Sequence, residues 1–471
     1  MAEPSCPGCQ ERDTRLTALE REVGALRATV RELQARLGQN ATNSSLPPSA
    51  NPPAAPKPVV KEPTGRTPGA QPGHAPCPRL RLPADRVTEV VRSLPTPCRC
   101  CQAALPAEPG PHDPEPSWHQ VAELPEITAR ITEHQGHART CPRCGARTHA
   151  AIPAEVRAHA RGPRLAAVMA YLSGARHDSK RGVAEVVETV FGVPVSLGTV
   201  AAVEQEASAA LAGAHAAAVE AVRQAPAKNA DETSWTEAGR WCWLWTALTD
   251  QVAGFVSHAR RGAEGLSALL GATSTGIVTS DRWGAYNRLD VYRRQLCWAH
   301  LLRDFQALVD RGGPGQTFGE ELLSLAEDVF HWWYRVRDGT LQRSTLRSYI
   351  DSQRPWLRNL LGSGAACGCA KTAALCRNLL AVEPALWTFV RVEGVEPTNN
   401  AAERALRPAV LWRRRSFGCH SAAGCRFVER MLTVVQTLRL QKRPVLDYLR
   451  RAMIAHRSGL PAPQLLGQMG N

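Results

Sequence analysis

The chain of 471 residues is too long for a single hydrophobic core, and its length predicts about three domains. It carries 57 Lys and Arg against 43 Asp and Glu, a net charge of +14, which favours nucleic acid as a partner before a membrane surface. No apolar run reaches the roughly 18 residues of a membrane span, and the N-terminus has no signal-peptide core. These features argue against membrane and secreted proteins and predict a cytoplasmic, nucleoid-associated one.

Residues 1–40 combine a cysteine pair with a heptad repeat. Cys6 and Cys9 supply only two ligands, so a metal there would need a second chain. Apolar residues then recur at spacings of three and four: Leu16, Leu19, Val23, Leu26, Val30, Leu33 and Leu37. Valine at the central a positions with leucine at d favours a parallel two-stranded coiled coil, which predicts a homodimer or higher oligomer. The alternative is an amphipathic helix packed on its own domain. The Pro- and Ser-rich residues 41–76 predict a disordered linker.

Residues 77–150 are rich in cysteine and proline and predict a zinc-binding domain. They contain two C-x-x-C pairs, Cys98 with Cys101 and Cys141 with Cys144. Four thiolates in two such pairs form a closed tetrahedral site for structural Zn²⁺. The long spacer leaves other ligands open: Cys100, His119, His134 and His137. Free buried cysteines are the alternative.

Residues 151–225 predict a helical region. A helix ends at Gly192, and Ser196 is a suitable N-cap for the next one. This order resembles a helix-turn-helix unit, which would bind DNA. A helical bundle that connects neighbouring domains fits the same pattern, and both interpretations stay open.

From about residue 226 the pattern changes to strands. Residues 241–249 and 252–258 are β-prone, a helix over 262–271 follows, and residues 276–281 form a short buried strand that ends in an acid. Long amphipathic helices return at about 315–392 as an insertion, and residues 416–471 predict C-terminal helices broken by Pro444. Trp283 and Trp298 are predicted to be core residues. The fold class is therefore multidomain α/β, with a mixed sheet in a domain over 226–415.

Two acids in that domain lie at strand positions, Asp231 on the first strand and Asp281 at the end of the short one. Since the carboxyl ends of parallel strands meet at one edge of a sheet, both can converge there, and Glu403 on a helix across that edge would complete a cluster. Three neighbouring carboxylates need compensating cations, and oxygen ligands suit two Mg²⁺ or Mn²⁺ ions about 4 Å apart. Strand-end capping is the alternative for each aspartate. The rival acids are Glu232, Asp250, Asp290 and Asp304.

Motifs along the whole chain carry a family resemblance. They are Cys6-Pro-Gly-Cys, the heptads, Asn43-Ser-Ser-Leu-Pro-Pro-Ser, the two cysteine pairs, Ala230-Asp-Glu-Thr, Ser280-Asp-Arg-Trp-Gly-Ala-Tyr, Cys297-Trp-Ala-His, Pro397-Thr-Asn-Asn-Ala-Ala-Glu-Arg-Ala-Leu-Arg-Pro and Arg413-Arg-Arg-Ser-Phe-Gly. With them the chain resembles the insertion sequence 66 family of transposases. The resemblance implies a ribonuclease-H-like catalytic domain with a helical insertion and a DDE triad of Asp231, Asp281 and Glu403.

The implied reaction is metal-dependent cleavage at the ends of a bacterial insertion sequence, followed by strand transfer into target DNA. His300 is expected near the scissile phosphate, with backbone bonding at a helix start as its alternative. Residues expected to bind DNA phosphates are Arg404, Arg407, Arg413, Arg414 and Arg415. Accessory proteins of the same element are possible partners, and no membrane is expected. Two other functions remain open: a non-catalytic DNA-binding regulator or decayed copy, and another ribonuclease-H-like nuclease.

Overall fold

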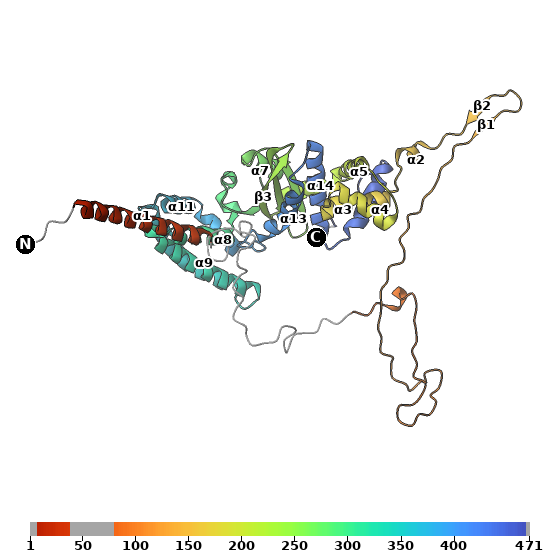
Figure 1. Ribbon diagram of the computed structural model, residues 1–471, viewed down its shortest axis with the longest axis horizontal. Coiled ribbons are helices and arrows are strands. Elements are labelled where there is room, and N and C mark those ends of the chain that lie inside the picture. The colour runs from red at the N-terminus through yellow and green to blue at the C-terminus, as the bar shows by residue number, and fades with distance from the viewer. Residues whose placement is uncertain (1–6, 38–79, 468–471) are drawn as a thin grey trace, which may run out of the picture. The chain divides into compact units, whose positions relative to one another are not determined.

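The computed structural model describes residues 7–37 and 80–467, and it divides into two compact units, Met1–Pro56 with Ile131–Asn471, and Lys57–Arg130. The smaller unit contains the short 3-10 helix η2 (Ala84–Arg86). The larger unit holds the other elements (Figure 1): α1 Pro7–Leu37, β1 Ala138–Thr140, β2 Arg147–His149, α2 Ala154–Ala158, α3 Pro163–Arg176, α4 Lys180–Phe191, α5 Leu197–Ala210, α6 Ala212–Gln224, β3 Ala227–Glu237, β4 Arg240–Leu248, β5 Ala253–His258, α7 Ala263–Leu270, β6 Ile277–Ser280, η3 Gly284–Arg288, η4 Val291–Arg293, β7 Arg294–Leu296, α8 Trp298–Arg311, η5 Gly313–Gly315, α9 Gln316–Arg337, α10 Arg343–Ala365, α11 Ala370–Ala381, η6 Glu383–Leu386, α12 Thr388–Arg391, α13 Asn400–Ser416, α14 Ala422–Leu440 and α15 Val445–Arg457. Among the described helices, none is long and apolar enough to cross a bilayer.

A five-stranded mixed sheet lies at the centre of the larger unit, in the order β5-β4-β3-β6-β7. Strand β4 pairs antiparallel with both β3 and β5. Strands β6 and β7 run parallel to β3. Ala238 and Gly239 join β3 to β4 with φ angles of 49° and 75°, the left-handed conformation that a two-residue hairpin turn requires. This sheet confirms the mixed α/β prediction.

The two faces of the sheet are covered by different helices. Trp235 on β3 meets Trp412 of α13 edge-on, with ring centroids 6.4 Å apart, so odd-numbered positions of this strand face α13. The even-numbered Glu232 lies on the opposite face, where Arg261, which precedes α7, pairs with it. Helix α14 runs along the edge strand β5, where Thr433 Oγ1 accepts a hydrogen bond of 3.0 Å from the Phe255 amide. Helices thus pack against both faces of the sheet and against its β5 edge.

Helices α3 to α6 pack with α14 and α15 into a bundle beside the sheet. Ser196 caps α5, as predicted, by accepting a hydrogen bond of 3.1 Å from the Thr199 amide. Helix α5 contacts α3, α4, α14 and α15, and its exposed positions carry no basic residue: Leu197, Gly198, Ala202, Gln205 and Ala209. Because α5 packs against these four helices and exposes no basic side chain, the bundle interpretation of the region is favoured.

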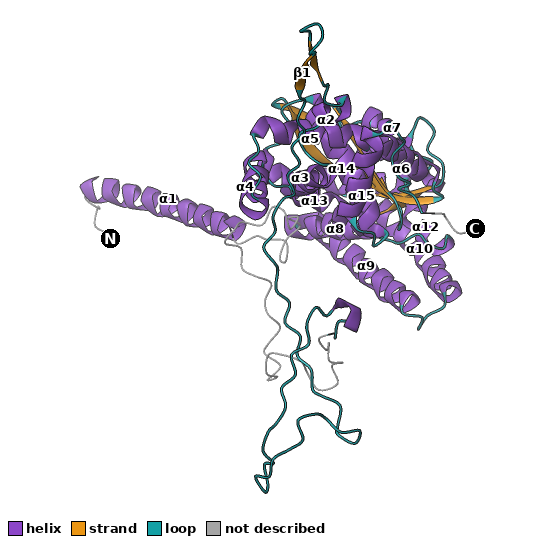
Figure 2. Cartoon of the chain, turned by 90° about the vertical axis from the view of Figure 1, so that its right-hand side faces the viewer, coloured by secondary structure: helices purple, strands orange, loops and turns teal. Residues whose placement is uncertain are grey.

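Helices α8 to α12 enclose a second apolar cluster, separate from the core around the sheet. Figure 2 shows α9 and α10 as a pair of long helices that extend away from the sheet. Trp298 and Trp387 both belong to this cluster, and their ring centroids are 5.1 Å apart. Trp298 is 1% exposed and is a core residue, as predicted. Trp283 is 40% exposed, so the prediction that it belongs to the core is wrong.

Candidate active site

Asp231 on β3 and Asp281 directly after β6 lie at the same level of two neighbouring parallel strands. Asn229 of β3 is in register with Thr279 of β6, and each aspartate comes two residues later along the chain, Asp281 one residue past the end of its strand. Neighbouring strands are about 4.8 Å apart, so continuing this register brings the two side chains next to each other. Asp231 lies within β3 and not before it, because the pairing with β4 extends down to Asn229. The sequence alone does not show how long that pairing is.

Glu403 reaches the same region because Asn399 fixes the start of α13 to β3. The buried Asn399 side chain donates a hydrogen bond of 2.8 Å to the Ala230 carbonyl, and its Oδ1 accepts one of 3.1 Å from Asn229 Nδ2. The Trp298 amide also donates to the Pro397 carbonyl at 2.9 Å, which ties the same segment to α8. Glu403, in the first turn of α13, is thereby held next to the strand that carries Asp231.

The pKa of Asp231 is raised by its burial and by the neighbouring acids. Burial raises the pKa of Asp231 well above its usual range, and the carboxylates of Glu232, Asp281 and Glu403 raise it further. His300 Nδ1 lies 3.4 Å from Glu403 Oε1, and burial lowers the pKa of His300, as does the charge of Arg303. Both of these atoms are buried and accept or donate no hydrogen bond. Nδ1 of the imidazole therefore faces Glu403 and makes no hydrogen bond to the backbone.

The site offers the donor atoms that a hard cation needs, in a partly assembled form. Three carboxylates face one region, and one buried oxygen, Glu403 Oε1, lacks a hydrogen-bond partner. Over residues 7–37 and 80–467, however, no three His, Cys, Asp or Glu side chains are arranged so that they could hold a metal ion. Carboxylate oxygens are nevertheless the type of donor that Mg²⁺ and Mn²⁺ prefer.

The rival acids are engaged elsewhere. Glu232 pairs with Arg261 Nε at 3.0 Å and accepts a hydrogen bond of 2.8 Å from the buried Tyr286 hydroxyl. Asp304 pairs with Arg282 at 2.8 Å, Asp290 accepts from the Tyr292 amide, and Asp250 is exposed. Burial raises the pKa of Glu232, as does the charge of Asp281. The negative charge of Glu232 thus acts on Asp231, while both of its oxygens are bonded to Arg261 and Tyr286.

Arg294 is a residue of this region that the sequence reasoning missed. It is buried on β7, where Nη2 donates 2.8 Å to the Asp281 carbonyl and Nη1 donates 3.0 Å to Asn287 Oδ1. Burial lowers its pKa to about 10, which still leaves it charged at neutral pH. It fixes the backbone on which Asp281 stands. Its place on a three-residue strand gave no sequence signal for this role.

The predicted DNA-binding arginines on α13 divide into two groups. Arg404, Arg407, Arg414 and Arg415 are exposed. Arg413 is half-buried, and its Nη1 donates to the Thr233 hydroxyl at 3.1 Å and to the Ser234 carbonyl, so it attaches α13 to β3. None of the ion pairs among the described residues joins Glu403 to Arg404 or Arg407. These two arginines are free to meet a ligand at the surface.

The two cysteine pairs each form the same type of turn. The Cys98 amide donates to the Ala103 carbonyl at 2.9 Å, and the Cys141 amide donates to the Ala146 carbonyl at 2.8 Å. Backbone amides of Cys101 and Cys144 lower the pKa of Cys98 and Cys141, respectively, which favours the thiolates that bind metal. The zinc site itself stays a prediction. Cys6 and the side chain of Cys9 lie outside the described residues.

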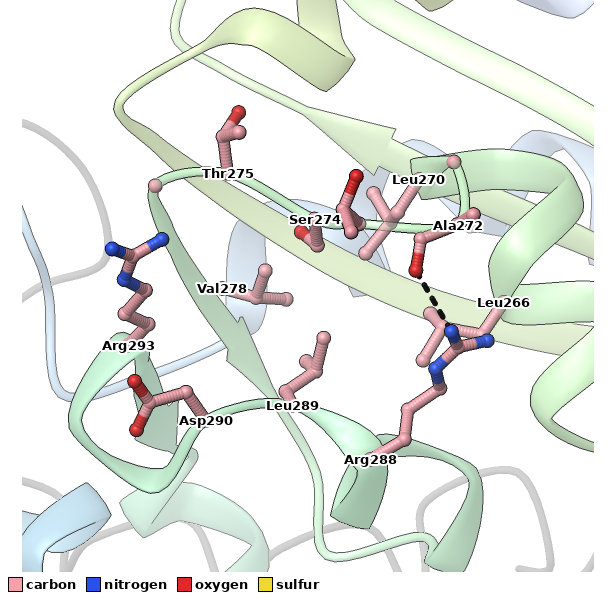
Figure 3. A pocket seen from close by; sticks show the side chains of 13 residues that line it. Leu266, Leu270, Ala272, Ser274, Thr275, Val278, Arg288, Leu289, Asp290 and Arg293 are labelled. Atoms are coloured by element: carbon pink, nitrogen blue, oxygen red, sulfur yellow. Dashed lines mark hydrogen bonds between the residues drawn. The ribbon is translucent and has the colours of Figure 1, made fainter.

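A pocket of about 310 Å³ lies at the opposite end of β6 from Asp281 (Figure 3). It is lined by residues 271–276 and by side chains of η3, η4 and the segment between them, among them Arg288, Asp290 and Arg293. The Arg288 guanidinium donates to the Ala272 carbonyl at 2.8 Å. No predicted catalytic residue lines this pocket, and Arg288, one of its two arginines, is bonded to the backbone.

Comparisons with known proteins show which family the chain belongs to. Residues 5–79 match a family of unknown function (DUF6444). An uncharacterized protein, y4qI of Sinorhizobium fredii, is 26% identical over 253 residues, which cover 47% of this chain. The chain spans 45% of the length of that relative. Residues 159–426, more than half of the chain, match the transposase IS66 family. The protein therefore belongs to the transposase IS66 family.

Proposed function

We propose that this protein is a DDE-type DNA transposase whose catalytic domain has a ribonuclease-H-like fold. The observation that carries the proposal is the common register of Asp231 and Asp281, with Glu403 held beside them by Asn399. The sheet order, with three antiparallel strands followed by two parallel ones, supports this fold. Family membership supports transposition as the process in which the site acts.

The reaction consists of two in-line displacements at phosphorus. In the first, a water oxygen bonds to the phosphorus at the element's end while the bond to the 3′ oxygen breaks, leaving a 3′-hydroxyl. In the second, that hydroxyl attacks a phosphodiester of target DNA, and a target 3′ oxygen leaves. Asp231, Asp281 and Glu403 would hold two Mg²⁺ or Mn²⁺ ions, which when bound activate the nucleophile and stabilise the leaving oxygen.

The remaining residues position the substrate. The exposed Arg404, Arg407, Arg414 and Arg415 bind DNA phosphates, and His300, beside Glu403, contacts the scissile phosphate. The two cysteine pairs bind structural Zn²⁺ through thiolates that backbone amides stabilise. A homodimer or larger assembly brings two element ends together in the nucleoid, with accessory proteins of the same element as possible partners.

The test is cleavage of duplexes that carry the DNA flanking the gene, by the full-length protein with Mg²⁺. We expect cleavage by the wild-type protein, and loss of cleavage with retained end binding for Asp231→Asn, Asp281→Asn and Glu403→Gln. The matched control is Asp250→Asn, because Asp250 is an exposed acid outside the site. This variant should cleave DNA as the wild type does. Normal cleavage by any of the three site variants contradicts the triad. Specific binding without cleavage by the wild-type protein would favour the regulator or decayed copy.

A further inference from the structure

Trp283 is a large apolar side chain that stays exposed beside the proposed catalytic carboxylates. It follows Asp281 by two residues, and its backbone amide donates a hydrogen bond of 2.9 Å to Asp281 Oδ1. Its side chain is 40% exposed. Single exposed tryptophans are common on protein surfaces, so exposure by itself is not evidence for a ligand. It is the position of Trp283 beside Asp281 that points to a ligand of the active site.

The indole is held rigidly from one side. Its Nε1 donates 3.0 Å to the Arg261 carbonyl, and the guanidinium carbon of Arg261 lies 3.9 Å from the ring centroid. The same guanidinium lies 4.8 Å from the ring centroid of Trp243. Arg261 thus packs against two aromatic rings, and it covers one face of Trp283.

The charge of Arg261 is already paired. Its Nε lies 3.0 Å from Glu232 Oε1, and the Glu232 side chain is buried. Tyr286 donates to the other oxygen of Glu232 at 2.8 Å. Because this network neutralises Arg261, the surface that remains at Trp283 is an aromatic ring and not a phosphate-binding cation. A flat apolar ring recognises another flat ring, by stacking.

We propose that Trp283 stacks on a nucleobase next to the scissile phosphate, once that base has left the duplex stack. The inference rests on the proposed function, since it identifies the ligand as DNA held at Asp231, Asp281 and Glu403. An aromatic ring accepts the face of any base, so the contact positions the strand without selecting sequence. A base at a nick or a strand end costs least to unstack, which suits a site that acts at the end of an element.

The experiment measures equilibrium binding of the full-length protein to element-end duplexes without added Mg²⁺ or Mn²⁺, so that it does not depend on cleavage, and without a chelator, which would remove the proposed structural Zn²⁺. A series of duplexes carries a single abasic nucleotide at successive positions along the end. For Trp283→Ala we expect affinity for the intact duplex to fall about 5-fold to 100-fold. At one abasic position, wild type and Trp283→Ala should bind equally. Trp283→Phe should retain most of the affinity, because it keeps a ring.

The matched control is Trp241→Ala, which removes an equally large side chain that is 70% exposed at the start of β4. It should bind every duplex as the wild type does. An affinity loss for Trp283→Ala that is the same at all abasic positions, or no loss at all, would overturn the stacking proposal. If Trp283 instead contacts a partner protein, Trp283→Ala should cause no loss of DNA affinity. Base-dependent binding by a protein that never cleaves with Mg²⁺ would contradict the proposed function and leave the stacking contact supported.

Discussion

Asn399 determines where the proposed third carboxylate lies. Its side chain bonds to the Ala230 carbonyl and to Asn229, one residue and two residues before Asp231, and α13 starts directly after it. Cys297, whose pKa burial raises to about 11, keeps its thiol and accepts from the Asn399 amide at 3.1 Å. The position of Glu403 is thus set by the side chain of Asn399, which attaches the start of α13 to β3.

Replacing Asn399 should therefore affect both stability and catalysis. Asn399→Ala leaves the buried Ala230 carbonyl without its side-chain donor, which costs about 1–3 kcal/mol. We expect the free energy of unfolding in urea to fall by that amount and Mg²⁺-dependent cleavage to fall as Glu403 loses its fixed position. Asn400→Ala, at the neighbouring exposed position, is the control. Equal stability and cleavage for both variants would show that Asn399 does not hold the site.

Helix α13 carries both a proposed catalytic carboxylate and the proposed surface for DNA. Arg404, Arg407 and Arg414 are exposed at spacings of three and seven residues, so they share one side of the helix. Glu403 lies at the start of the same helix, and Trp412 and Arg413 attach its end to β3. The helix can thus align a phosphate backbone with the carboxylates.

This alignment predicts how binding responds to salt. Each of Arg404→Ala, Arg407→Ala and Arg414→Ala should reduce the slope of log K against log salt by about 0.9, because each removes one phosphate contact. Arg413→Ala is the comparison: it should lower thermal stability and leave the slope unchanged, since its guanidinium bonds to β3. The slope is measured by fluorescence anisotropy over a salt series. Unchanged slopes for all three exposed variants would exclude this side of α13 as a DNA surface.

Individual helices and strands were more predictable from sequence than the contacts between residues far apart in the chain. The β-prone segment before residue 249, the helix over 262–271 and the Ser196 cap were expected where the structure has them, because period and capping are local properties. The partners of Glu232 and Asp281 were not expected. Arg261, Tyr286 and Arg294 reach these acids from 29, 54 and 13 residues away in the chain, respectively. Only the packing of the whole sheet brings them together.

Trp283 shows a second limit of sequence reasoning. A tryptophan beside a buried strand is usually a core residue, and Trp298 follows that rule. Trp283 lies beyond the end of β6, where the chain turns into η3, so its ring is directed by Arg261 and not by the core. Exposure of this kind depends on the tertiary position of a loop, which local periodicity does not encode.

At the scale of the whole molecule, helix α1 has an unpartnered apolar side among the described residues. Leu16, Leu19, Val23, Leu26 and Val30 are 44–58% exposed, and they are the positions of the predicted heptad. We expect Leu26→Asp to lower the mass of the full-length protein in solution from that of an oligomer, as measured by multi-angle light scattering. Arg21→Ala, outside the heptad core, should leave the mass unchanged. An unchanged mass for Leu26→Asp would favour packing of α1 on its own domain.

The most direct test of the triad is strand transfer with a pre-cleaved element end and a supercoiled target plasmid, in Mg²⁺. If Asp231, Asp281 and Glu403 form one centre for phosphodiester exchange, the wild-type protein joins a 3′-hydroxyl end to the plasmid. Glu403→Gln, and a wild-type reaction with a 3′-deoxy end, then give no joined product. Joining by Glu403→Gln at the wild-type rate, or cleavage by the wild-type protein without any joined product, would contradict the account.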